Sequence, residues 1–217
     1  MKYELCYVLF TAEKYAECIK YAGESLKTYD NDSCLLSFKI KSLYELNLTE
    51  DIKAIAPNID NIDEDSNQPY NIFNKALCYS LAGDHEKAEL LCNKLIESNR
   101  NDSGFYHLHG NVKYEQGLYE DSVSLYLKAV NRLDEENQEL FSDLGISYLK
   151  LDELNKAKFW LNKSLSMNPK RSDTMYYMGL YYEKMNVPEK SSEYIHNSAD
   201  RGYFKAVRYL EDKIRME

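Results

Sequence analysis

Small residues recur along the chain at intervals of 34 or 35 residues, and this period constrains the fold more than any other feature. The first set is Ala76, Gly110, Gly145 and Gly179, separated by 34, 35 and 34 residues. Twelve residues after each of these comes a second small residue, in the set Ala88, Ser122, Ala157 and Ser191. A fixed period of about 20 to 50 residues is typical of structural units that stack in sequence order.

Each unit contains the elements of two helices joined by a turn. Gly83 and Gly117 lie between the two small residues, where a reversal of the chain needs a positive φ that glycine adopts without steric cost. Asn186 suits the same position and Asp152 suits it less well, while Pro188 fits the first turn of a new helix. The small residues let the two helices approach closely. The space between the helices would be filled by Tyr79, Tyr148, Tyr182, Cys92, Tyr126, Leu161 and Ile195.

The chain divides into four parts by the strength of this pattern. Residues 69–203 hold four clear units, and residues 1–57 hold two degenerate ones, with Pro57 shortening the last helix. Residues 58–68 contain four acidic residues and little apolar periodicity, so we expect an acidic loop or hinge. Residues 204–217 have a few apolar residues at helical spacing and are otherwise polar, as expected of a helix that caps the end of the array. Eight glycines and four prolines are too few for a turn-rich β fold, and we predict an all-α protein.

The pattern resembles the tetratricopeptide repeat, a helix–turn–helix unit of about 34 residues. This resemblance implies a right-handed α-solenoid of tandem repeats, with about six helix pairs and a C-terminal capping helix. It also implies that the first helices line a concave groove that receives a segment of a partner protein. The resemblance covers nearly the whole chain, closely in residues 69–198 and loosely in residues 1–57.

Eight residues on the predicted first helices are the candidates for binding a partner. They are Phe73, His107, Asn111, Tyr114, Asp143, Ile146, Tyr176 and Tyr177. His107, Asn111 and Tyr114 share one helix face because they lie at i, i+4 and i+7. A groove that is aromatic and acidic should prefer a ligand with basic and apolar groups. The alternative is that these are ordinary surface positions and the partner binds elsewhere.

Two other ligands of helical repeat proteins fit this sequence poorly. Repeat domains that capture acidic chaperone tails use lysine, arginine and asparagine, but the matching positions here are His107, Asn111, Asp143, Asp173 and Tyr177. Only Asn111 agrees, and the carboxylates would repel an acidic tail. Pentatricopeptide RNA readers have a similar period, but a net charge of -9 disfavours nucleic acid.

The sequence gives no sign of catalysis or of a cofactor or metal site. The four histidines include His107 and His109, whose spacing places them on different faces of a helix. Asp60, Asp63 and Asp65 lack the glycine and the closing glutamate of a calcium-binding loop. We therefore expect a non-catalytic scaffold or adaptor with no cofactor and no metal.

The N-terminal stretch suggests a different function, that of a self-associating structural subunit of a large complex. Apolar or aromatic residues at 3, 5, 6, 8, 9 and 10 exceed what one face of a terminal helix can bury, so residues 1–57 could pair with a second copy. Glu4 interrupts this stretch, and no cleavage site follows, so we do not expect a secretory leader. No apolar run is long enough to span a membrane, and five cysteines without a CxxC pair favour a reducing compartment. We expect a soluble cytoplasmic protein.

Overall fold

The computed structural model describes residues 3–64 and 69–216, and the regular structure along them is helical. It comprises thirteen α-helices and one short 3-10 helix, η1, and the α-helices form six consecutive pairs followed by the single helix α13. The predictions of an all-α fold and of about six helix pairs with a terminal helix are therefore confirmed. The chain divides into two compact units, Met1–Gln116 and Gly117–Glu217, and each is described by itself.

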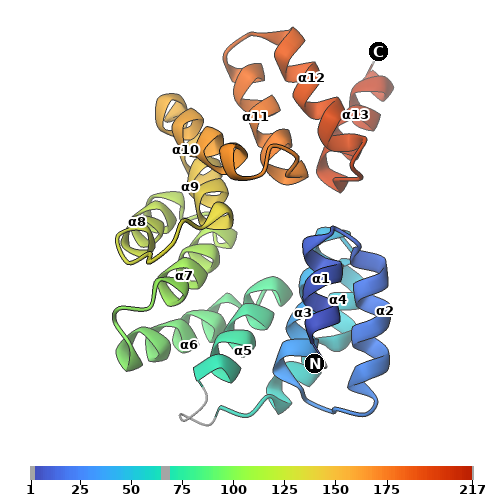
Figure 1. Ribbon diagram of the computed structural model, residues 1–217, viewed down its shortest axis with the longest axis vertical. Helices are drawn as coiled ribbons and strands as arrows, with labels where there is room; N and C mark the ends of the chain where they lie inside the picture. The colour runs from blue at the N-terminus through green and yellow to red at the C-terminus, as the bar shows by residue number, and fades with distance from the viewer. Residues whose placement is uncertain (1–2, 65–68, 217) are drawn as a thin grey trace. The chain divides into compact units, whose positions relative to one another are not determined.

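The first unit contains seven α-helices and η1. They are α1 (Glu4–Thr11), α2 (Tyr15–Leu26), α3 (Ser33–Glu45), α4 (Thr49–Ile55), η1 (Ala56–Asn61), α5 (Pro69–Ala82), α6 (His85–Ser98) and α7 (Ser103–Glu115). Successive helices pack on one another as antiparallel hairpins (Figure 1). A continuous core runs from Leu36 on α3 to Val112 on α7. A smaller cluster around Cys6 and Cys18 joins α1, α2 and α3.

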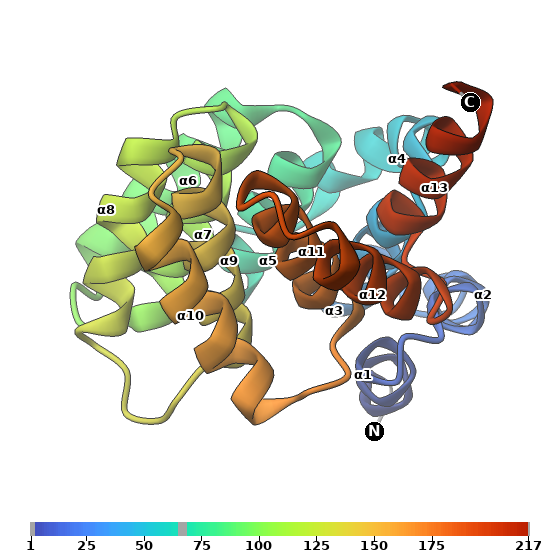
Figure 2. The same cartoon turned by 90° about the horizontal axis from the view of Figure 1, so that it is seen from above.

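The second unit contains the remaining six helices. They are α8 (Tyr119–Val130), α9 (Gln138–Lys150), α10 (Leu154–Met167), α11 (Ser172–Lys184), α12 (Pro188–Ala199) and α13 (Phe204–Met216). Each packs on the next, and α11, α12 and α13 lie side by side in both views (Figures 1 and 2). Ala206 on α13 is fully buried against Ile195 and Tyr203. The remainder of α13 beyond Leu210 is exposed as far as Arg215.

A residue in the left-handed region marks the turn within every helix pair. These residues are Glu13, Asn47, Gly83, Gly117, Asp152 and Asn186, with φ between 55° and 87°. Their spacings are 34, 36, 34, 35 and 34 residues, taken as differences between successive positions. The same backbone turn thus occurs in the two degenerate N-terminal pairs, although their side chains depart from the pattern.

Two glycines on first helices are required by close approach of the second helix. A Cβ added at Gly145 would lie 2.8 Å from Cγ and 2.9 Å from the backbone N of Leu161. At Gly179 the added Cβ would lie 2.5 Å from Cγ1 of Ile195. Separations below 3.0 Å force neighbouring atoms to move, so both positions exclude any larger residue without strain. The small residues predicted on the first helices therefore have the packing role that the period indicated.

The predicted acidic loop differs from the structure in its first half. Residues 56–61 form η1, and Ile59 and Ile62 are buried in the core of the first unit. Lys75 on α5 donates to the carbonyl oxygens of Asp60 and Ile62 at 3.2 and 3.0 Å and pairs with Glu64 at 2.9 Å. These contacts hold residues 59–64 against α5, whereas residues 65–68 lie outside the described residues. The division of the chain at residues 57, 68 and 203 stays a prediction.

Candidate protein-binding surface

The eight candidate residues lie on first helices of the repeats, as expected, but in two groups. Phe73 is on α5, and His107, Asn111 and Tyr114 are on α7, all in the first unit. The other four, on α9 and α11 of the second unit, are Asp143, Ile146, Tyr176 and Tyr177. Each group forms a local surface of its own unit.

Aromatic rings connect α5 to α7 in the first unit. Phe73 is half-buried, and its ring lies 6.3 Å from that of Phe105 on α7. On the other side it stacks on Tyr70 at 6.4 Å, and Tyr70 is 60% exposed. Tyr70 was not among the predicted residues, although its position three residues before Phe73 on the same helix could have indicated it.

One face of α7 carries polar and aromatic side chains that the core does not fully cover. His107, Asn111 and Tyr114 are all half-buried. Leu108 and Val112, on the opposite side of the helix, are buried in the core. Because the three residues lie at i, i+4 and i+7, they form one continuous strip along the helix.

A hydrogen bond joins α3 to α7 across α5. The hydroxyl of Tyr44, near the end of α3, donates to Oε1 of Glu115, the last residue of α7, at 2.8 Å. Helix α5 packs on both of these helices. The bond therefore bridges two helices that are not consecutive in the chain and that both pack on α5.

The predicted residues of the second unit are less available to a partner. Ile146 and Tyr177 are only 7% and 6% exposed, so most of their surface packs within the unit. Asp143 and Tyr176 are half-buried. The ring of Tyr176 lies within 5.2 to 6.2 Å of the rings of Tyr177, Tyr203 and Tyr209. Burial, with Tyr177, Tyr209 and Glu183, raises the pKa of Tyr176 to about 12.

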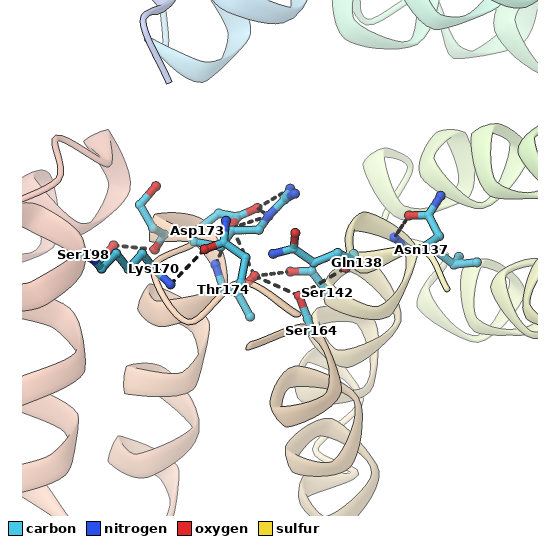
Figure 3. Close-up of polar contacts among 12 residues, drawn as sticks. Asn137, Gln138, Ser142, Ser164, Lys170, Asp173, Thr174 and Ser198 are labelled. Atoms are coloured by element: carbon cyan, nitrogen blue, oxygen red, sulfur yellow. Dashed lines mark hydrogen bonds and ion pairs between the residues drawn. The ribbon is translucent and has the colours of Figure 1, made fainter. Parts of the chain in front are cut away.

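An arginine compensates part of the predicted acidity of the second unit. Arg171 precedes α11 and pairs with both carboxylate oxygens of Asp173, at 2.8 Å and 2.9 Å (Figure 3). Burial alone would lower the pKa of Arg171, but Asp173, Glu139 and Asp143 raise it above its usual value. Asp173 therefore pairs directly with the guanidinium, and Glu139 and Asp143 act on it as further negative charges. The sequence interpretation missed Arg171 because it searched helix positions only.

A buried layer of hydroxyl groups fixes the helices that carry these charges. The hydroxyls of Ser142 on α9 and Thr174 on α11 are 2.8 Å apart (Figure 3). Ser164 on α10 donates to the carbonyl oxygen of Gln138 at 3.1 Å and lies 3.4 Å from the Thr174 hydroxyl. The three helices are thus joined by polar contacts at the end where Asp173 lies.

The side chains that could act as nucleophiles or metal ligands are dispersed or buried. Within residues 3–64 and 69–216, no three His, Cys, Asp or Glu side chains come together as a metal ion would require. All five cysteines are free. Burial raises the pKa of the thiols of Cys6 and Cys92 to about 12, so both stay protonated at neutral pH.

The length and hydropathy of the helices decide whether any of them could span a membrane. Among the described residues, none of the helices is both long enough and apolar enough to cross one.

Two helix pairs match the family model of the tetratricopeptide repeat. The matches cover residues 71–102, which hold most of α5 and all of α6, and residues 139–171, which hold most of α9 and all of α10. Solved structures of the same class resemble the whole chain. A tetratricopeptide repeat protein from Parabacteroides merdae has a TM-score of 0.71 at 15% identity, over 100% of this chain and 83% of that one. The chain therefore contains tetratricopeptide repeats and has an all-α solenoid fold.

Other similar proteins belong to larger assemblies or longer chains. The crystal structure of the APC/C hetero-tetramer Cut9–Hcn1 has a TM-score of 0.69 at 14% identity, over 89% of this chain and 36% of that one. Anaphase-promoting complex subunit 3 of Schizosaccharomyces pombe is 26% identical over 119 residues, which is 55% of this chain and 18% of that protein. Human protein O-mannosyl-transferase TMTC2 is 30% identical over 87 residues, 35% of this chain and 10% of that protein. The chain spans less than a fifth of these curated relatives.

Proposed function

We propose that this chain is a non-catalytic scaffold that binds a segment of a partner protein along its first helices. The observation that carries this proposal is the strip of half-buried His107, Asn111 and Tyr114 on α7. The bond between Tyr44 on α3 and Glu115 on α7 supports a concave surface across α5. Stacked helix pairs present such concave surfaces to extended or helical peptides. We also propose a cytoplasmic location, because five free cysteines suit a reducing compartment.

The expected partner segment carries basic and apolar side chains. In the first unit, the aromatic run of Tyr70, Phe73 and Phe105 offers contact area to an apolar side chain. In the second unit, the carboxylates around Arg171 outnumber its positive charge, which favours a basic group. The names of two similar proteins, a subunit of the anaphase-promoting complex and a hetero-tetramer of that complex, support a role in assembly.

A matched pair of triple variants tests this proposal. His107→Ala, Asn111→Ala and Tyr114→Ala remove the strip on α7. The control removes three exposed residues with the same spacing on α6, by Glu86→Ala, Leu90→Ala and Asn93→Ala. Both proteins should keep the circular dichroism of the original chain. Partners captured from the source cell are then identified by mass spectrometry.

We expect a partner to be lost with the α7 variant and retained with the α6 variant. The affinity for a purified partner should fall at least tenfold with the α7 variant, which is about 1.4 kcal/mol. Equal binding by both variants would show that the first helices do not hold the partner.

Self-association through α1 is a second candidate, favoured by one observation. Four apolar or aromatic side chains on or next to this terminal helix are exposed: Tyr3 (43%), Leu5 (43%), Tyr7 (60%) and Val8 (56%). If α1 pairs with a second copy, light scattering of the intact chain should give a dimer mass that Tyr7→Glu reduces to the monomer mass. A monomer mass at high protein concentration would rule this candidate out.

A further inference from the structure

Helix α10 has a charge opposite to that of the protein as a whole. It contains Lys156, Lys158 and Lys163 and has no acidic residue, although the formal net charge of the chain is -9. Lys156 and Lys158 are exposed, and Lys163 is half-buried. Lys156 is paired with Glu153, the residue before the helix, at 2.5 Å. Lys158 and Lys163 are therefore the lysines that make this helix a local basic surface on an acidic protein.

The same helix carries an exposed phenylalanine next to a half-buried tryptophan. Ala157 and Leu161 are fully buried on the side of α10 that packs on α9. Phe159 lies two residues from each of them, on the opposite side, and is 61% exposed. Its ring meets that of half-buried Trp160 edge to face at 5.0 Å. An exposed phenylalanine beside a tryptophan is typical of an interaction surface.

Contacts with α9 and with the preceding loop keep these side chains in place. The ring of Trp160 lies 5.5 Å from the ring of Phe141, which is buried on α9. The Nζ atom of Lys163 lies 4.2 Å from the ring centroid of Phe141 and 5.9 Å from that of Trp160. Because the rings and the ammonium group contact one another, these side chains should lose little conformational entropy when a partner binds.

A carboxylate of the chain itself, that of Glu136, forms an ion pair with a lysine of this surface. Oε1 of Glu136, in the connection between α8 and α9, lies 2.9 Å from Nζ of Lys163. Glu136 is itself 60% exposed, so an external carboxylate can replace it at low cost.

We propose that the α10 surface, formed by Phe159, Trp160, Lys163 and Met167, docks a partner segment that carries carboxylates and apolar side chains. Met167 extends the surface one turn beyond Lys163 and is 40% exposed. The carboxylates pair with the lysines of α10, and the apolar groups cover the Phe159 and Trp160 rings. This site lies on a second helix and is separate from the first helices of the proposed function. Its partner also has the opposite charge.

Trp160 is the only tryptophan in the chain, so its fluorescence reports directly on this surface. The probe is a synthetic peptide of glutamate, phenylalanine and leucine, and the comparison peptide has lysine in place of glutamate. The acidic peptide should shift the Trp160 emission to shorter wavelength and the basic peptide should not. Added salt should weaken the binding, because its charge pairs lie at the protein surface.

Three variants measure the contributions of individual side chains to binding of the acidic peptide. Phe159→Ala should weaken binding about tenfold with unchanged circular dichroism, because this side chain is exposed. Leu90→Ala is the matched control, because Leu90 holds the corresponding sixth position of α6 and is 69% exposed, and it should bind normally. Glu136→Gln frees Lys163 and should tighten binding about twofold to fivefold, a gain that misfolding cannot produce.

Several results would overturn the proposal. They are equal binding of the acidic and basic peptides, unchanged affinity in Phe159→Ala, and an emission shift caused by raised protein concentration alone, which would indicate a second copy. A shift with anionic phosphatidylserine vesicles but none with the acidic peptide would assign the surface to a membrane instead. The α7 triple variant should bind the acidic peptide normally, so failure of the proposed function leaves this test intact.

Discussion

Alanine at Gly145 should destabilise the protein, although alanine is the better helix former. Within a helix, alanine is favoured over glycine by about 0.5–1 kcal/mol. Here the new Cβ would lie 2.8 Å from Cγ and 2.9 Å from the backbone N of Leu161, and backbone atoms of a packed helix move only with their neighbours. Overpacking of this kind costs about 1–3 kcal/mol. The net expected loss is about 1–2 kcal/mol.

Gly23 on α2 is the matched control, because the same substitution there meets only ordinary van der Waals contacts. The nearest atom to an added Cβ is Nζ of Lys39 at 3.8 Å, at the end of a flexible side chain. Gly23→Ala should therefore stabilise the protein by about 0.4–1 kcal/mol. The two substitutions are chemically identical, and only the surrounding packing gives them opposite signs.

Urea unfolding, followed both by circular dichroism and by Trp160 emission, measures these differences. Trp160 lies one residue from Leu161, so its emission follows the disturbed helix pair. In a Leu161→Ala background, two of the three closest atoms are absent, and the cost of Gly145→Ala should fall by about 1 kcal/mol. If Gly145→Ala proves as stable as the original chain or more so, close helix approach is not what selects the small residue.

Three further substitutions have defined outcomes in the same unfolding assay. Thr174→Val removes the partner of the buried Ser142 hydroxyl and should cost about 1–2 kcal/mol, whereas equal stability would mean that the hydroxyl layer contributes nothing. Gly83→Ala places a Cβ at φ 87° and should cost about 1 kcal/mol, unless the turn relaxes to a negative φ and leaves stability unchanged. The hydrogen bond from Lys75 lowers the pKa of the Glu64 carboxyl group. The stabilisation of the protein by this bond is therefore present above the usual carboxylate pKa and is lost as the pH falls through the lowered pKa. Glu64→Gln should therefore destabilise by about 1 kcal/mol or less at pH 7 and not at all in strong acid, and a difference that persists in acid would contradict this linkage.

The repeat period predicted most of the fold, because close helix approach and a left-handed turn both demand particular residues. Gly145 and Gly83 are examples of the two demands. The period was harder to recognise in the sequence where residues other than glycine adopt the left-handed turn. Glu13 adopts a φ of 58° in the first turn, and glutamate has no preference for that region that a sequence reader could recognise.

The acidic segment was misread because composition outweighed spacing. Ile59 and Ile62 are three residues apart, which places them on one side of a 3-10 turn and lets both enter the core. The neighbouring acidic residues favoured a loop in the sequence interpretation. The buried Lys75 on α5, which binds the backbone of this segment, could have been noticed only with the tertiary structure.

The candidate binding surface stays a prediction, but the structure shows which of its residues are accessible. The half-buried strip on α7 follows from helical spacing alone. Ile146 and Tyr177 were predicted to lie on the same kind of surface, but each is largely buried. Successive residues of a helix are rotated by about 100°, so an error of one position is enough to exchange an exposed residue for a buried one. The bond from Tyr44 to Glu115 joins residues 71 apart, and no sequence pattern indicates such a pair.

The regular recurrence of the left-handed turns has a consequence for how such a chain changes length. Any stretch between two successive turns holds one complete turn-to-turn module of 34 to 36 residues. Duplication or deletion of such a stretch in the gene keeps every helix in phase with its neighbours, because each helix pair packs mostly on the pairs before and after it. The turns therefore mark the points at which recombination can lengthen or shorten the protein while disturbing a single junction.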